Sequence, residues 1–426
     1  MPQPYELKNL CEQGRYEQAA AFSENREEVA AFTEWDFIYC INALYKLERY
    51  RQCMDLCRLC AEKYPAAAVY DRMGWCLYRT EVSCFDAGRQ NAYDLYKEID
   101  SLLGRLSATV YSPAWPLVKF VTEAAEKGRL GTGRDCEAAI ALLERIDPDT
   151  LSAQAPRAAV HGGRETALPS PRESWYTRKT KLLLSLGRYE ECLRCCDAAL
   201  EAFAVFHTDS GSWFRYRRAR CLLALGRADE ARDQAEGILN SGFRHWCLTQ
   251  MLFELEAEAG HAEKALARAG ECALSDHEHK MRVSFYMELA DHLEREGDTE
   301  LPPLLRRLVI LLREENGWPL KTVHQGWHFP ESIAAMDKHT VLAKLVPVWR
   351  VWRDRGRVYT TGVIDTLFAE RGFGFIRAEN GASVYFRIDR RGPVPREGMK
   401  VRFALTQRMD RSKNEMRPAA EEIIPL

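Results

Sequence analysis

Two Cys-x-x-Cys pairs are the first residues of this sequence whose type and spacing suggest chemistry. They are Cys57 with Cys60 and Cys192 with Cys195. Such pairs bind zinc when two of them lie on neighbouring loops. Cys53, Cys57 and Cys60, however, follow the i, i+4, i+7 spacing of one helix face, where free cysteines pack as small apolar side chains. We therefore expect buried cysteines, with a zinc site as the less favoured alternative and redox chemistry as a weaker one.

Two histidine clusters are weaker candidates for metal binding. His324 and His328 are four residues apart, and His277 lies two residues from His279. Neither cluster has the Cys or acidic partners of a recognisable metal or catalytic set. The glycine-rich segment 128–135 lacks the Gly-Lys-Ser/Thr end of a phosphate-binding loop. Because no Ser-His-Asp order or paired carboxylates can be isolated either, we expect no catalytic residues, no metal and no cofactor, although a scattered active site stays open.

A third candidate combines aromatic and basic residues near the end of the sequence. In the stretch RGFGFI, 371–376, two phenylalanines alternate with glycine at the spacing of a strand, and VYFRI, 384–388, has the same alternation. If Ile376 and Phe386 point inward, the alternate side chains share an outer face. Rings on such a face can stack on bases, and arginines beside them can contact phosphates. The predicted nucleic-acid-binding residues are Arg371, Phe373, Phe375, Arg377, Tyr385 and Arg387.

The charge distribution agrees with a polyanion partner at this end. The whole sequence has a formal net charge of -2, but residues 350–426 contain 16 Lys and Arg against 10 Asp and Glu. The rest of the chain is therefore acidic overall. A basic region is where a nucleic acid would bind.

The elements that must position these residues are short strands. Segments 362–368, 371–378 and 384–388 alternate in the manner of strands, and Asn380-Gly381 is a strong signal for a tight hairpin turn. Residues 401–405 also alternate, and 415–424 can supply a last strand. Five short strands in about 65 residues predict a small barrel of the oligonucleotide-binding kind.

This region resembles a cold-shock domain over roughly residues 359–426. Arg371 to Ile376 match the family's Lys-Gly-Phe-Gly-Phe-Ile motif, and Val384 to Ile388 match its second aromatic strand. The resemblance implies a surface for single-stranded nucleic acid. The sequence departs from the family where the first strand carries Asp365, Thr366, Leu367 and Phe368 in place of Lys-Trp-Phe-Asn, and where Arg387 and Ile388 replace His and Phe. The alternative is that the Phe-x-Phe pair packs beneath another element, such as a tryptophan-rich connector.

A repeated phrase organises the region before the barrel. EQGRYEQAA, KLERYRQCM, SLGRYEECL, ALGRADEAR and EAGHAEKAL recur with Gly14, Glu48, Gly187, Gly226 and Gly260 at the same place. Successive separations are 34 within the first block and 39 and 34 within the second. A period of about 34 residues with a turn between two helices is typical of tetratricopeptide repeats.

The sequence thus resembles the tetratricopeptide family, which implies an all-α repeat solenoid that binds a protein partner. Together with the small all-β barrel this makes a multidomain protein. The expected domains are repeat blocks at 1–146 and 175–315, a flexible linker or loop at 147–174, a Trp- and His-rich connector with a capping helix at 316–358, and the barrel at 359–426.

Composition and the lack of targeting patterns limit the functions that we expect. The opening residues show no signal-peptide pattern, no apolar run approaches the ~20 residues of a membrane span, and 14 cysteines without a secretory pattern suggest reduced thiols in the cytoplasm. We expect a non-enzymatic adaptor that binds a protein through its repeats and single-stranded RNA, or DNA, through its barrel. Two alternatives are a scaffold or regulatory subunit whose barrel contacts protein only, and an enzyme hidden in the linker or the 316–357 segment.

Overall fold

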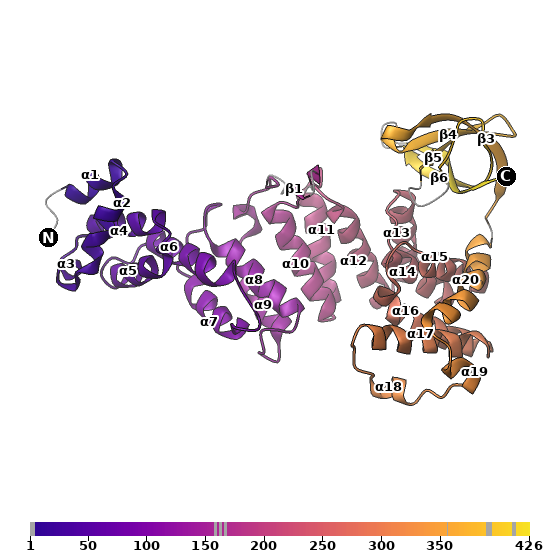
Figure 1. The fold of residues 1–426 in the computed structure, drawn as a ribbon, viewed down its shortest axis with the longest axis horizontal. Helices are drawn as coiled ribbons and strands as arrows, with labels where there is room; N and C mark the ends of the chain where they lie inside the picture. Colours follow the sequence, from indigo (N-terminus) through magenta and orange to yellow (C-terminus); the bar gives the residue numbers. More distant parts are fainter. Residues whose placement is uncertain are drawn as a thin grey trace. The chain divides into compact units, whose positions relative to one another are not determined.

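A computed structural model describes residues 5–156, 160–161, 164–165, 168–355, 357–388, 394–410 and 415–426. Two compact units divide the chain, Met1–Cys221 and Leu222–Leu426, and the boundary falls within one helix. The predicted fold class is confirmed, because a helical region precedes a closed five-stranded barrel (Figure 1).

The first unit consists of helices joined by short turns, with two short strands, β1 (Val160–His161) and β2 (Arg164–Glu165), between its ninth and tenth α-helices. The α-helices are α1 (Glu6–Glu12), α2 (Tyr16–Ala21), α3 (Arg26–Ala30), α4 (Glu34–Lys46), α5 (Tyr50–Lys63), α6 (Ala67–Leu77), α7 (Ala92–Leu103), α8 (Ala114–Glu126), α9 (Asp135–Leu143), α10 (Pro171–Ser185), α11 (Tyr189–Ala202) and α12 (Ser210–Ala224).

The repeated phrase forms the turn inside each helix pair, as the spacing predicted. Gly187 has a φ of 70°, and the next residue, Arg188, donates its backbone N–H to the carbonyl of Leu183 at 3.0 Å. The same backbone hydrogen bond, reaching back five residues, recurs after Gly14, Gly226 and Gly260. A left-handed residue that ends a helix in this way satisfies carbonyls left without intrahelical partners.

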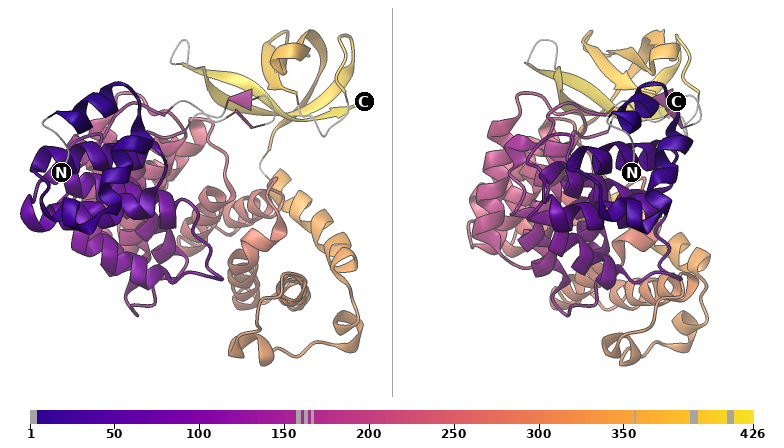
Figure 2. Two further views of the ribbon diagram at one scale, coloured as in Figure 1. Left: turned by 60° about the vertical axis from the view of Figure 1, so that its left-hand side comes forward. Right: turned by 90° about the vertical axis from the view of Figure 1, so that its left-hand side faces the viewer.

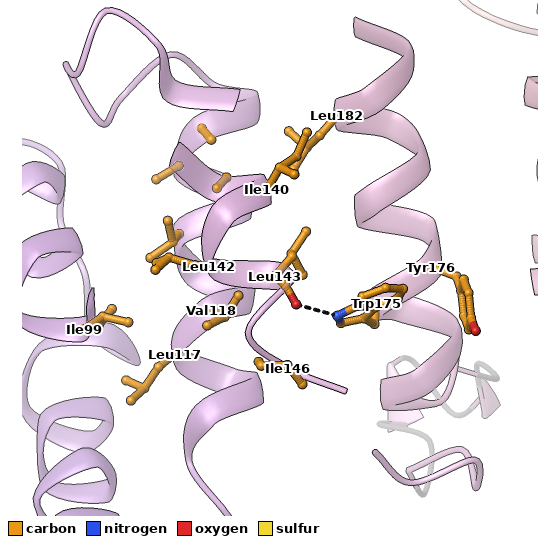
Figure 3. Close-up of a cluster of buried hydrophobic side chains, with 14 of the residues drawn as sticks. Ile99, Leu117, Val118, Ile140, Leu142, Leu143, Ile146, Trp175, Tyr176 and Leu182 are labelled. Atoms are coloured by element: carbon orange, nitrogen blue, oxygen red, sulfur yellow. Dashed lines mark hydrogen bonds between the residues drawn. The ribbon is translucent and has the colours of Figure 1, made fainter. Parts of the chain in front are cut away.

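One continuous hydrophobic core joins the two predicted repeat blocks within the first unit. Figure 3 shows Leu143 and Ile146 packed toward Trp175 of α10, whose indole Nε1 donates to the carbonyl of Leu143 at 3.0 Å. Helix α10 begins at Pro171 inside the range predicted as linker, with a capping box formed by Ser170 and Glu173. Residues on both sides of the predicted linker therefore share one core.

The second unit begins with further helix pairs: α13 (Ala228–Asn240), α14 (Trp246–Glu258), α15 (Ala262–Ala273), α16 (Val283–Arg295), α17 (Leu301–Glu315), α18 (Thr322–Gln325), α19 (Glu331–Ala334) and α20 (Lys338–Asp354). Helix α20 lies within the predicted connector and packs against α15 and α17. Its Trp349 is fully buried and stacks on Tyr286 with ring centroids 5.6 Å apart and planes 5° from parallel. Trp349 and Trp352 thus complete the core of the last helices.

The barrel contains strands β3 (Tyr359–Phe368), β4 (Phe373–Ala378), β5 (Ser383–Arg387), β6 (Lys400–Asp410) and β7 (Glu415–Pro425). They close in the order β3-β4-β5-β7-β6, with β5 and β7 parallel and the other pairs antiparallel. Strands β6 and β7 run side by side in the yellow part of Figure 2. The inner side is filled by Ile364, Ile376, Phe386, Val401 and Phe403, which are almost fully buried.

Ion pairs connect the barrel to the helices of the same unit. Arg357 lies between Glu271 of α15, at 3.2 Å, and Glu422 of β7, at 3.6 Å. Glu422 also pairs with Arg353 of α20 and accepts a hydrogen bond of 2.8 Å from the hydroxyl of Tyr359. The charged side chains of these ion pairs are only about a fifth exposed, so the connection is shielded from solvent.

Within the described ranges, every helix is too short or too polar to traverse a lipid bilayer.

Candidate nucleic-acid interface

The β4–β5 hairpin brings most of the predicted site residues together. Phe375 is paired with Tyr385, and Phe373 with Arg387, across the two strands. Gly381 has a φ of 81° in the turn, and Ala382 donates its N–H to the Asn380 side chain, so the Asn-Gly turn forms where it was predicted.

Alternation along the hairpin assigns the two faces as expected. Gly374, Ile376, Val384 and Phe386 are buried inside the barrel, and Ile388 packs against the same core. On the other side, Phe373, Phe375 and Tyr385 are half-buried, while Arg371, Arg377 and Arg387 are exposed.

The rings form a cluster of four, because Phe368 at the end of β3 joins the three predicted aromatics. Its ring centroid is 4.9 Å from that of Phe373, and Phe373 is 5.7 Å from Tyr385, each pair tilted by 32°. Phe375 stands nearly perpendicular to these three rings, at 86°, 89° and 72°. Phe368 is 39% exposed. We call these four residues the ring cluster.

Sequence reasoning missed Phe368 because a bulge interrupts β3. The register with β4 shifts between Ile364 and Thr366, so that Ile364 and Leu367 both contact the barrel core. An extra residue reverses the alternation that follows it, which directs Phe368 to the outer face. The signal was the three-residue spacing of Ile364 and Leu367, which does not fit a regular strand.

The two glycines of the motif, Gly372 and Gly374, meet two different structural requirements. Gly374 faces the interior, where a Cβ atom would lie 2.7 Å from the Phe386 ring and from the Thr366 carbonyl oxygen. Gly372 has a φ of 73° and accepts the backbone hydrogen bond of Ile388. Gly374 thus permits close packing inside the barrel, and Gly372 permits the turn into β4.

The three predicted arginines surround the ring cluster in two groups. Arg371 lies two residues before Phe373, and Arg387 lies opposite Phe373, so both are at one end of the hairpin. Arg377 lies at the other end, where its Nη2 is 2.6 Å from Oδ1 of Asp365. The face therefore has positive charge at both ends, and one of these cations is paired.

Strand β6 adds cations that sequence reasoning did not include. Lys400 is paired with Val363, and Arg402 with Thr361, across the exposed outer side of β3. The Arg402 guanidinium lies 4.4 Å from the centroid of the Tyr359 ring. These two residues extend the basic surface beyond Arg377.

The tryptophan-rich connector does not cover the ring cluster in the described part of the chain. The ring contacts of Phe373 and Phe375 there are with each other, Phe368 and Tyr385. Trp349 and Trp352 belong to the helical core instead.

The cysteine pairs lie on helices, at the small-residue positions of the repeats. Cys57 and Cys60 of α5 are fully buried, and burial raises the pKa of the Cys60 thiol to about 11. Cys195 of α11 is half-buried, and its pKa is likewise raised to about 11 by burial. Such thiols stay protonated at neutral pH and are poor nucleophiles and metal ligands. Among the described residues, no group of three Cys, His, Asp or Glu side chains could hold a metal ion.

The histidine clusters participate in local packing. His324 is buried, its Nδ1 accepts the N–H of Lys321 at 2.9 Å, and burial lowers its pKa. His279 lies 2.6 Å from the hydroxyl of Tyr286, and burial lowers its pKa to about 4. Both side chains are therefore neutral at physiological pH.

Comparison with known proteins assigns no family to this chain. No protein-family model matches it, and no curated protein matches its sequence. One similar solved structure is described as "Structure of Naa15/Naa10 bound to HypK-THB", at 15% sequence identity and a TM-score of 0.30. The match covers 83% of this chain and 55% of the other, so the chain spans just over half of that protein's length. The fold of this protein is therefore defined by its own helices and strands and not by similarity to a known structure.

Proposed function

We propose that this protein is a non-enzymatic adaptor in which the helix pairs bind a protein partner and the barrel binds a short stretch of single-stranded nucleic acid, RNA in preference to DNA. The observation that carries the proposal is the ring cluster, with exposed arginines at both ends, on the outer face of a five-stranded barrel. Aromatic side chains stack on bases of any sequence, and arginines contact the phosphates between them. The resemblance to cold-shock domains adds to this reading.

The helical part supports the proposed binding of a protein partner. Stacked helix pairs present side chains of successive helices on one extended surface, which is suited to binding a peptide or a folded protein. The combination of helix pairs and a barrel suits an adaptor of a bacterial stress or defence system.

The proposal predicts that the ring cluster is required for nucleic-acid binding. The double variant Phe373→Ala/Phe375→Ala removes two stacking rings, each worth ~1 to 3 kcal/mol, and should weaken binding by at least ~30-fold. Fluorescence anisotropy of the full chain with a labelled oligouridine of about ten nucleotides measures this, alongside the matching deoxyribose oligonucleotide. The affinity of wild type should fall with salt, with a log-log slope near -0.7 per phosphate contacted.

A matched control is the double variant Trp35→Ala/Tyr111→Ala, which removes two exposed aromatic side chains from the helical region. It should bind like wild type. If Phe373→Ala/Phe375→Ala also binds like wild type, the ring cluster is not the binding surface.

A second candidate is a scaffold or regulatory subunit whose barrel contacts only protein. It is favoured by Asp365 and Thr366, because a carboxylate and a short polar side chain stand beside the ring cluster where the cold-shock family has Lys and Trp. Purification at low salt with an absorbance ratio typical of clean protein, together with no binding of labelled single strands, would support this candidate. Crosslinking followed by sequencing of the copurified nucleic acid would support the first.

A further inference from the structure

Asp365 stands at the point where the regular pairing of β3 with β4 is interrupted. Ile364 pairs with Ile376 and Thr366 with Phe375, so Asp365 is the extra residue of the bulge. Its carboxylate Oδ1 lies 2.6 Å from Nη2 of Arg377. The bulge thus brings a carboxylate to a cation beside the ring cluster.

The pair lies where the backbone of a bound strand would pass. Arg377 is two residues beyond Phe375 on the same strand and therefore on the same face. A nucleotide stacked on Phe375 or Tyr385 would place its neighbouring phosphate near this guanidinium. In the free protein that positive charge is already compensated.

The other cations and carboxylates of this sheet are arranged differently. Within the described residues, neither Arg371 nor Arg387 has a carboxylate partner. Glu379 accepts a hydrogen bond from the hydroxyl of Thr361, and Glu397 accepts the N–H of Leu367 at 2.8 Å. Among the residues that the structure describes, Asp365 is therefore the carboxylate that forms an ion pair with one of the predicted phosphate-binding arginines.

We propose that Asp365 is a built-in competitor of the nucleic-acid backbone for Arg377, which lowers the affinity of the barrel and limits it to short, loosely held single strands. This inference rests on the proposed binding of single-stranded nucleic acid. An exposed ion pair of this kind is weak, so a phosphate can displace the carboxylate. The displaced carboxylate stays next to the phosphate and repels it.

The test uses the full chain and the labelled oligouridine of about ten nucleotides. Asp365→Asn keeps the shape of the side chain and removes its charge. It should bind about three- to tenfold more tightly than wild type at low salt, with the gain shrinking as salt is added. The log-log salt slope should become steeper by about 0.7, because Arg377 then contacts a phosphate without a carboxylate that compensates its charge.

The matched control is Glu379→Gln, which removes one negative charge from the same sheet without releasing an arginine. It should change the affinity less than twofold. As a second measurement, Arg377→Gln should weaken wild-type binding less than Arg387→Gln does, because the charge of Arg377 is compensated beforehand.

The outcomes separate this inference from the proposed function. If wild type binds and Asp365→Asn binds no more tightly than Glu379→Gln, Asp365 is not a competitor and the ring cluster remains a binding surface. If neither wild type nor Asp365→Asn binds, both the proposed function and this inference are wrong. A gain confined to Asp365→Asn, with the steeper salt slope, supports the competition.

Discussion

Gly374 couples the outer face of the β4–β5 hairpin, which carries the ring cluster, to the interior of the barrel. It lies between Phe373 and Phe375 of the ring cluster but faces inward, against the ring of Phe386 and the carbonyl of Thr366. A side chain there would displace Phe386, β3 or both. The positions of the outer rings therefore depend on the absence of a side chain on the inner face.

The corresponding prediction concerns stability. Gly374→Ala should lower the free energy of unfolding of the barrel by ~1 to 3 kcal/mol, because the added methyl overpacks the core. Hydrogen exchange of the β4 and β5 amides measures this locally. A Cβ atom at Gly237 of α13 would meet open space, so Gly237→Ala should instead stabilise α13 by up to ~1 kcal/mol. Hydrogen exchange of the α13 amides should then be slower. Unchanged exchange in Gly374→Ala would contradict the close approach.

Part of the candidate site could be predicted residue by residue, and part could not. Strand alternation was sufficient to predict the outer positions of Phe373, Phe375 and Tyr385, because the β4–β5 hairpin is regular. It failed for Phe368 and for the Asp365–Arg377 pair, since both depend on the bulge in β3. A bulge is set by pairing with a distant strand, and local periodicity carries little information about it.

At the scale of elements, the turns that contain the repeated phrase share one backbone conformation, and one of them places a residue other than glycine at the left-handed position. Glycine occupies the left-handed position at Gly14, Gly187, Gly226 and Gly260, but Glu48 occupies it between α4 and α5, with a φ of 58°. The backbone hydrogen bonds around Glu48 are the same as in the other turns. The turn therefore forms with a residue that carries a steric cost in this conformation.

This exception gives a reciprocal pair of variants. Glu48→Gly should raise the free energy of unfolding by roughly 0.5 to 1 kcal/mol, because the strain at the left-handed position exceeds the entropy cost of glycine. Gly226→Glu should lower it by a similar amount. Thermal unfolding of both variants, followed by circular dichroism, provides the measurement. Equal midpoints for Glu48→Gly and wild type would show that the strain is relieved elsewhere.

At the scale of the whole molecule, the repeat pattern predicted the helix pairs but not how the blocks join. The phrase that marks each turn is local, so it was visible in the sequence. The shared core that joins Leu143 and Ile146 to Trp175 depends on contacts across residues 147–170, which have no apolar period of their own. The composition of this segment therefore gave no sign of the core that Leu143, Ile146 and Trp175 share.

Within the second unit, Arg357 holds the barrel against the helices through carboxylates on both sides. The side chains of Arg357, Glu271 and Glu422 are only about a fifth exposed. Breaking a pair that is largely removed from water leaves uncompensated charge and costs more than breaking an exposed pair. The attachment of the barrel should therefore be sensitive to this one arginine.

Arg357→Gln should accelerate proteolytic cleavage between α20 and β3 several-fold, because the barrel separates from the helices more often. Arg355→Gln is the matched control, since Arg355 pairs with Glu263 in a more exposed position, at 3.1 Å. Limited proteolysis with mass spectrometry compares the two variants with wild type. If both variants are cleaved at the wild-type rate, the ion pairs of Arg357 do not hold the barrel in place.

The strand order of the barrel has a consequence for the order in which the parts of the protein fold. Strand β7 pairs with both β5 and β6, so the barrel closes only after β7 has been synthesised. Each helix pair, by contrast, is built from neighbouring segments and can fold as it leaves the ribosome, since local contacts form fastest. During synthesis the helix pairs can thus be complete while the ring cluster still has no closed barrel behind it.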